Sequence, residues 1–140
     1  MKILMAVDGS HVTKRMLSYV AAHDELLGPG HEYTLVHVVA PVPAYAASLL
    51  QAGTLETYYR EEAEKVFHPI RGFTDQQGWK VRLVHEHGHA ADVIAALAES
   101  GHADIVLMGT HGHSSLGNVV LGSVATGVLA RCKVPVLLIR

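Results

Sequence analysis

The sequence has a single cysteine, Cys132, among its 140 residues. One thiol cannot form an intramolecular disulfide, which excludes a small disulfide-stapled scaffold and a zinc site made of cysteines. The chain also lacks any stretch of about 18 uninterrupted apolar residues, the length that a membrane-spanning helix needs. The apolar run near its start is too short for a secretory signal. We therefore expect a cytoplasmic protein with no membrane partner.

Charge is scarce as well. Charged residues make up 17% of the chain, and the formal net charge is −2 with the histidines neutral. Binding to nucleic acid would need a concentrated excess of lysine and arginine, so we expect no nucleic-acid partner. Apolar residues reach 49%, which excludes a disordered chain and predicts one folded domain over residues 1–140.

Short apolar runs alternate with segments of helical periodicity. The runs are typical of strands buried on both faces of a sheet, and they cover 3–7, 34–39, 80–86, 104–108 and 134–139. The third run alternates more than the others, which indicates a sheet edge. Strand–helix alternation of this kind predicts an α/β fold, with an open five-stranded parallel sheet and helices on both faces.

The helical segments carry apolar residues at spacings of three and four. We predict helices over 11–27, 55–73, 90–98 and 123–132. Ser10 is a candidate N-cap for the first helix, and a loop over 40–53 precedes the second. We expect Pro69 to kink or split that second helix. In the last helix, Val124 and Leu129 belong to the predicted apolar stripe.

Ligands of open parallel sheets bind at the carboxyl ends of the strands, and two segments stand out there. Val7 and Asp8 end the first run, and a glycine-rich loop from Gly109 to Leu121 leads into a helix at Gly122 and Ser123. Glycines let backbone N–H groups approach an anion, and a helix N-terminus adds donors and a positive dipole end. Together they predict a phosphate-binding site, although each glycine alone could simply shape a turn.

The glycine-rich loop is not a Walker A motif, because the required lysine is missing before Ser123. Without that cation, backbone dipoles, a metal ion or histidines must meet the charge of a triphosphate. We therefore expect binding with at most weak hydrolysis. Asp8 and His111 are the candidate bases, and Asp8 before a glycine is also a common turn residue.

Gly109, Gly112, Gly122 and Ser123 match the G-x2-G-x9-G-(S/T) signature of the nucleotide-binding members of the universal stress protein family. The segments ILMAVDGS, LVHVV, ADIVLMGTHG, LGSVA and VPVLLIR resemble that family at matching places along the whole chain. The resemblance implies a Rossmann-like fold with strand order 3-2-1-4-5. It also implies an adenine-nucleotide site and a role in stress response.

At matching positions the resemblance implies these nucleotide-binding residues: Val7, Asp8, Val38, Met108, Gly109, His111, Gly112, His113, Gly122, Ser123 and Val124. Val38 would contact the adenine. Asp8 would lie beside the ribose and phosphates, or beside a phosphate-bound Mg²⁺ or Mn²⁺ ion. Two positions depart from the family pattern: His113 stands where arginine is common, and Ala125 where some members have a hydroxyl residue. Both changes remove phosphate contacts.

Eleven histidines are many for a chain of this length. His85, His87 and His89 alternate, so on a strand they would share one face and could bind zinc; edge-strand histidines are more often solvated. His111 and His113 lie in the glycine-rich loop. Protonated, they could partly replace the missing cation, so we expect nucleotide affinity to rise as the pH falls from about 7.5 to 6.

The final run, Val134 to Ile139, is almost wholly apolar and would form a sheet edge. An uncovered apolar edge promotes aggregation, and the same strand of a second copy would cover it in a two-fold homodimer. The family resemblance implies the same dimer. Burial beneath the protein's own helices is the alternative.

Three functions remain open. The first is a dimeric module that binds ATP or another adenine nucleotide in stress response. The second is an interaction protein of the same fold with a vestigial nucleotide site. The third is a slow ATPase. The intact glycine signature favours the first, and the missing lysine and arginine disfavour the third.

Overall fold

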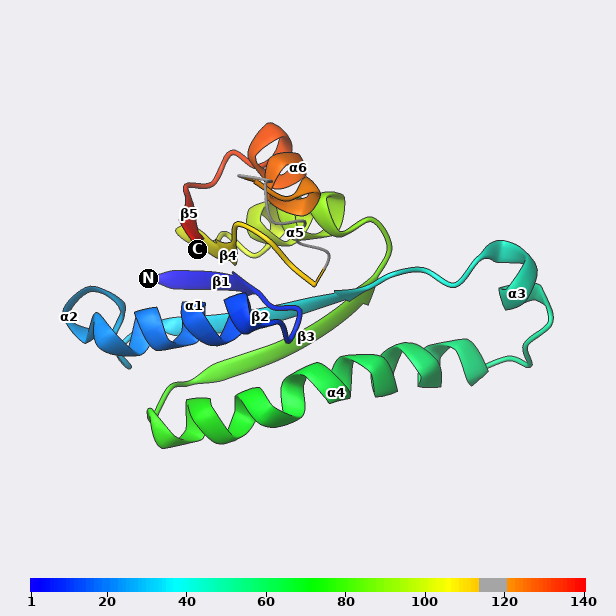
Figure 1. The fold of residues 1–140 in the computed structure, drawn as a ribbon, viewed down its shortest axis with the longest axis horizontal. Coiled ribbons are helices and arrows are strands. Elements are labelled where there is room, and N and C mark those ends of the chain that lie inside the picture. Colours follow the sequence, from blue (N-terminus) through cyan, green and yellow to red (C-terminus); the bar gives the residue numbers. More distant parts are fainter. Residues whose placement is uncertain (114–120) are drawn as a thin grey trace.

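A five-stranded parallel sheet with the order β3-β2-β1-β4-β5 forms the centre of the protein, as predicted (Figure 1). The computed structural model describes residues 1–113 and 121–140. The strands are β1 (Lys2–Ala6), β2 (Glu32–Val39), β3 (Val81–His87), β4 (Ile105–Gly109) and β5 (Val136–Ile139). The helices are α1 (His11–Ala22), α2 (Asp24–Leu27), α3 (Ala44–Ser48), α4 (Thr54–Gln76), α5 (Ala90–Ser100) and α6 (Ser123–Arg131). The edge position predicted for the third strand is confirmed.

Helices cover both faces of the sheet. Helices α1 and α4 pack on one face, and α5 and α6 pack on the other (Figure 1). Successive residues of β1 point to opposite faces, so Ile3 and Met5 enter the α1–α4 core while Leu4 enters the α5–α6 core. Burial on both faces explains why the strand is continuously apolar. None of the described helices is long and apolar enough to cross a membrane.

The first predicted helix is broken in two. It was expected to reach Leu27, but α1 ends at Ala22 and α2 follows as a separate turn. His23 lies between them: its backbone N–H donates to the Val20 carbonyl, and its ring Nδ1 lies 2.8 Å from the Tyr19 carbonyl oxygen. A side chain that binds a carbonyl of the last turn caps the helix, so α1 stops there.

The segment predicted as a loop over 40–53 contains the short helix α3. This helix has no buried residue and projects beyond the carboxyl end of β2 (Figure 1). Tyr45 in this helix and Leu49 just after it are 78% and 70% exposed. Its five residues are too few to display a helical period, so the sequence pattern could not indicate it.

Pro69 does not split α4, which is one helix over Thr54–Gln76. Proline removes one backbone N–H and crowds the carbonyl four residues earlier, which belongs to Lys65. Both residues are on the exposed side of the helix, where water can bind that carbonyl. Phe67 and Ile70 are buried against the sheet and hold the helix in place. Packing therefore outweighs the effect of the proline.

The apolar stripe predicted for α6 is partly wrong. Val124 and Leu129 are 37% and 46% exposed, whereas Ala125 and Val128 are buried. The buried side of α6 approaches α5 closely: a Cβ built on Gly127 would lie 2.6 Å from Ala91 Cβ. Small residues therefore define this contact, and they give a weaker hydrophobic pattern than large ones.

Two helical glycines should respond to alanine with opposite signs. Gly72→Ala in α4 should stabilise the protein by about 0.5–1 kcal/mol, because no atom lies within 4 Å of the new Cβ and alanine has less conformational entropy to lose. Gly127→Ala should destabilise it by about 1–3 kcal/mol, because its Cβ would overlap Ala91. Urea unfolding of both variants checks this. Shifts of the same sign would contradict the close α5–α6 contact.

Candidate functional site

A cavity of about 270 Å³ opens at the carboxyl ends of β1, β2 and β4. All the residues predicted to bind nucleotide line it: Val7, Asp8, Val38, Met108, Gly109, His111, Gly112, His113, Gly122, Ser123 and Val124. They come from the turn after β1, from β2, from the end of β4 and the loop after it, and from the start of α6. Residues 114–120 of the predicted glycine-rich loop lie outside the described part of the chain.

The carboxylate of Asp8 organises the turn between β1 and α1. Its Oδ1 accepts the Ser10 backbone N–H at 2.9 Å and the Thr13 hydroxyl at 2.9 Å, and the Thr13 oxygen accepts the Asp8 N–H at 3.1 Å. Gly9 adopts a left-handed φ of 77° within this turn. Asp8 therefore has the turn-forming role that the sequence offered as an alternative. Among the described residues, its second oxygen, Oδ2, accepts no hydrogen bond.

Ser10 takes the predicted N-cap position of α1 without capping the helix. Its side chain makes no capping hydrogen bond, and its Oγ is buried without a partner among the described residues. A Ser10 cap would accept a backbone N–H of the first turn, but here the side-chain contact with that turn comes from Asp8, which accepts the Thr13 hydroxyl. The helix start is therefore ordered by Asp8.

Two histidines hold the same turn from either side. His37 of β2 donates its Nδ1–H to the Val7 carbonyl at 2.8 Å, and His113 donates its Nε2–H to the Asp8 carbonyl at 2.7 Å. A carbonyl only accepts, so each of these ring nitrogens carries the proton. The His37 ring packs edge-on against Phe67. The turn is thereby tied both to β2 and to the loop after β4.

The signature glycines lie in close contact with their neighbours, and a side chain at Gly109 or Gly112 would force a neighbouring side chain to shift. A Cβ on Gly109 would lie 2.4 Å from Val12 Cγ1, and a Cβ on Gly112 would lie 2.5 Å from Asp8 Oδ2. A Cβ on Gly122 would lie 3.0 Å from a backbone oxygen. These approaches bring the loop after β4 against the turn after β1. The glycines thus have a structural purpose as well as a place in the cavity wall.

The N-terminus of α6 forms one side of the cavity. The Gly122 N–H donates to the Thr110 carbonyl at 2.7 Å, which joins the two ends of the glycine-rich loop. Gly122 stands at the N-cap, and no side chain caps the helix. Ser123, the first helical residue, is exposed. Backbone donors and a hydroxyl therefore converge where an anion could bind.

Sequence reasoning missed several residues of the cavity wall, among them Thr13, His37, Ala90, Ile94 and Thr110. His37 is the one that the sequence could most readily have indicated, because it is a polar residue inside an apolar strand run. Ala90 and Ile94 belong to α5, whose packing across β1 and β2 is a tertiary feature. The local pattern around these two residues shows only an amphipathic helix.

The pKa of the Asp8 carboxyl lies below its ordinary value of 3.8. Burial raises this pKa, but hydrogen bonds from Ser10 and Thr13, together with the charge of His113, outweigh burial. The folded protein therefore favours the carboxylate. The cavity keeps a negative charge at the point where Asp8 Oδ2 meets Gly112.

His85, His87 and His89 do not form a shared metal site. No group of three His, Cys, Asp or Glu side chains in the described ranges could hold a metal ion. The ring of His87 stacks on Tyr59, with centroids 4.4 Å apart and an interplanar angle of 3°. His89 lies beyond the end of β3, and its Nδ1 is 2.9 Å from Asp92 Oδ2.

An open parallel α/β sheet with a glycine-lined cavity at its carboxyl edge defines a Rossmann-like binding fold. The model of the "Universal stress protein family" matches residues 1–140. A Thermus aquaticus protein, "Universal stress protein in QAH/OAS sulfhydrylase 3'region", is 33% identical over 138 residues, covering 99% of this chain and 97% of that protein. The chain belongs to the universal stress protein family.

Solved structures share this fold. MJ0577 from Methanocaldococcus jannaschii matches with a TM-score of 0.81 and 29% identity, covering 99% of this chain and 94% of that one. The universal stress protein from Archaeoglobus fulgidus in complex with dAMP matches with a TM-score of 0.71 and 21% identity, covering 100% and 98%. The predicted family and strand order are thereby confirmed.

Asp8→Asn should lower the free energy of unfolding at pH 7, because an amide oxygen accepts hydrogen bonds more weakly than a carboxylate. The folded-state pKa of Asp8 is depressed, so its stabilising effect is present above 3.8 and is lost as the pH falls through the lower folded value. The difference in the free energy of unfolding between wild type and variant should therefore become smaller in acid. Urea unfolding at pH 7 and near pH 3 measures it, and a constant gap would contradict this role.

Proposed function

We propose that this protein binds an adenine nucleotide, ATP included, in the cavity at the carboxyl edge of the sheet. The observation that carries the proposal is the meeting of all the predicted site residues around one cavity, with the uncapped start of α6 on its wall. The Archaeoglobus fulgidus relative, of the same fold, was crystallised in complex with dAMP, which supports the same ligand class here. Stress response is the proposed biological setting.

The cavity has a polar and an apolar side suited to the two parts of a nucleotide. Val38 and Met108 would contact the adenine, as apolar strand-end residues. The backbone N–H groups of Ser123 and Val124 in the first turn of α6, together with the hydroxyl of Ser123, would hold phosphate oxygens. His113 would face the phosphates where family members often have arginine.

A Mg²⁺ or Mn²⁺ ion on the phosphates would fit beside Asp8. Its Oδ2 is a carboxylate oxygen without a hydrogen bond among the described residues, and hard cations prefer such ligands. The ion would supply the positive charge that a Walker lysine provides elsewhere. Asp8 would hold it while Oδ1 remains committed to the turn.

We propose a binding role with little hydrolysis. No lysine precedes Ser123, and Asp8, one of the two candidate bases, already accepts two hydrogen bonds through Oδ1. A vestigial site in an interaction protein, or a slow ATPase, would give different results in the following experiment.

The full-length protein should retain nucleotide when it is purified without any addition. Denaturing it and identifying the released compound should yield ATP at close to one equivalent per chain. ADP instead would indicate hydrolysis. No released nucleotide, together with no calorimetric signal on adding ATP, would overturn the proposal and favour the interaction protein.

A matched pair of variants locates the site. Gly112→Val should weaken ATP binding more than tenfold, because its Cβ would lie 2.5 Å from Asp8 Oδ2. Gly30→Val is the control, since no atom lies within 4 Å of that Cβ. Equal affinities in the two variants would place the nucleotide elsewhere.

Affinity for ATP should increase as the pH falls from about 7.5 to 6, because protonated histidine attracts phosphate. His113 is the proposed source, with the Asp8 carboxylate and His111 as the charged or titratable groups beside it. His113→Gln keeps a donor for the Asp8 carbonyl and should lose this increase. The affinities of both proteins are measured by calorimetry at the two pH values. Protonation of ATP itself affects both proteins equally, so it drops out of the comparison. Parallel responses would exclude His113.

We also propose a cytoplasmic homodimer formed through Val134 to Ile139. β5 is a sheet edge, and its residues Val136, Leu137 and Leu138 are only partly buried by the chain itself. In a parallel ladder, each residue directs its N–H and C=O to the same neighbour. Because Pro135 and Ile139 bond to β4, Val136 and Leu138 direct theirs outward, toward a second copy.

Leu138→Pro should convert the dimer to a monomer in light scattering at micromolar concentration. Proline removes the outward N–H of this residue without removing a bond to β4, and proline is tolerated on edge strands. Leu138→Val keeps the N–H and should remain dimeric. A monomeric wild-type protein would refute the dimer outright.

A further inference from the structure

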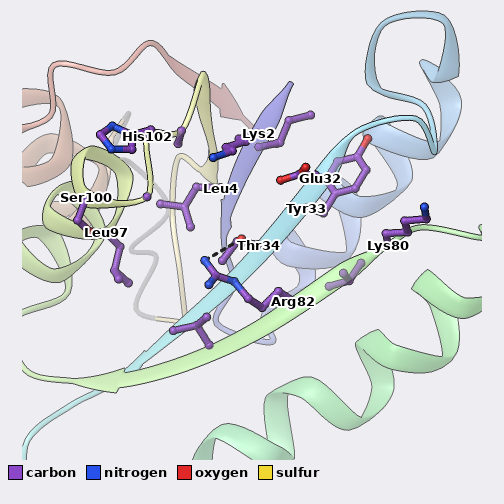
Figure 2. A pocket seen from close by; sticks show the side chains of 15 residues that line it. Lys2, Leu4, Glu32, Tyr33, Thr34, Lys80, Arg82, Leu97, Ser100 and His102 are labelled. Atoms are coloured by element: carbon purple, nitrogen blue, oxygen red, sulfur yellow. Dashed lines mark hydrogen bonds between the residues drawn. The ribbon is translucent and has the colours of Figure 1, made fainter.

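A second and larger cavity, of about 860 Å³, lies at the opposite edge of the sheet. Its floor is formed by the amino-terminal halves of β1, β2 and β3, and the last turn of α5 forms one wall (Figure 2). It shares no lining residue with the cavity at the carboxyl edge. Nothing in the proposed nucleotide function uses it.

The position of α5 on the sheet explains why this groove is uncovered. On the α5–α6 face, α5 packs mainly on α6 and β2, and no described helix covers the amino-terminal half of β3 (Figure 1). Leu97 of α5 and Val84 of β3 are therefore only partly buried, and they face a common space. Together with Leu4 they give the groove an apolar floor.

The residues of the floor form rows across the three strands. Strand pairing aligns Leu4 with Thr34 and Thr34 with Arg82, and all three point to the α5 side (Figure 2). One row further toward the amino ends, Lys2 is paired with Glu32, and Lys80 immediately precedes β3. An apolar floor thus changes to a charged rim within two rows.

The rim has an excess of unpaired positive charge. Lys2, Lys80 and Arg82 form no ion pair with a carboxylate in the part of the chain that the structure describes. The Arg82 side chain points into the groove, where its Nη2 lies 3.4 Å from Thr34 Oγ1 (Figure 2). Glu32 is the one carboxylate among the lining residues, so the lysines and arginine leave a net positive charge.

We propose that this groove binds a small anionic amphiphile, a carboxylate or sulfonate attached to an apolar body. The acidic group would bind the Arg82 guanidinium, which offers a planar pair of donors, with Lys2 and Lys80 adding long-range attraction. The apolar body would cover Val84 and Leu97, which α5 leaves partly exposed. A cavity of this volume and concave shape suits a small molecule better than a flat protein surface.

Removing the Arg82 guanidinium tests whether this side chain binds the acidic group of the ligand. The probe is anilinonaphthalene sulfonate, whose fluorescence rises when its apolar rings leave water, added to the folded full-length protein. Arg82→Gln should weaken its binding about tenfold or more. Arg60→Gln removes the same charge from an exposed position on α4, on the other face of the sheet, and should change affinity less than twofold.

Competition identifies which cavity is occupied. Octanoate should displace the probe, and saturating ATP should not, since the two cavities share no residue. Ser100→Glu places a negative charge on the exposed wall of the groove and should weaken binding as Arg82→Gln does, which covers the case of an unstable Arg82 variant. Displacement by ATP, equal affinities in the Arg82 and Arg60 variants, or no binding below millimolar probe would each overturn the proposal.

Discussion

The turn that joins β1 to α1 is the constraint on which the rest of the functional edge depends. Three elements hold it: β2 through the His37 ring, the loop after β4 through the His113 ring, and α1 through Thr13. The Val7 carbonyl accepts the His37 ring N–H, and the Asp8 carbonyl accepts the His113 ring N–H. A turn bound on every side can present one carboxylate oxygen, Asp8 Oδ2, in a defined direction while the other oxygen maintains the fold.

This arrangement makes the structural and binding explanations of the glycine signature compatible. Gly112 is needed because Asp8 occupies the space where its side chain would be, and Gly109 is needed because Val12 does. The same approaches align the cavity wall with the start of α6. A protein of this fold with an unused site would still need these glycines, so the signature alone identifies a geometry. Nucleotide retained through purification would be the direct evidence for use of the site.

The sequence predicted most of the fold because burial on both faces produces continuous apolar strands, and α/β alternation restricts the topology. It failed where one or two local contacts decide the outcome. His23 ends α1 through its contacts with two carbonyls of the last turn, and the close approach of Gly127 to Ala91 moves the buried stripe of α6. The candidate site was predictable where family motifs mark it. Ile94 and Thr13 join it only through packing and hydrogen bonding that no linear pattern contains.

Strand order gives the two edges of this sheet different chemistry. At the carboxyl edge, connections leave β1 and β4 toward opposite faces, so a crevice opens between neighbouring strands, lined with backbone donors and the start of a helix. At the amino edge of the sheet lie the carboxyl ends of the helices. The negative end of each helix dipole disfavours anions. Any positive potential there must come from side chains such as Arg82 and Lys80. Recognition at that edge would therefore depend on a few replaceable residues, whereas recognition at the carboxyl edge would depend on the fold itself.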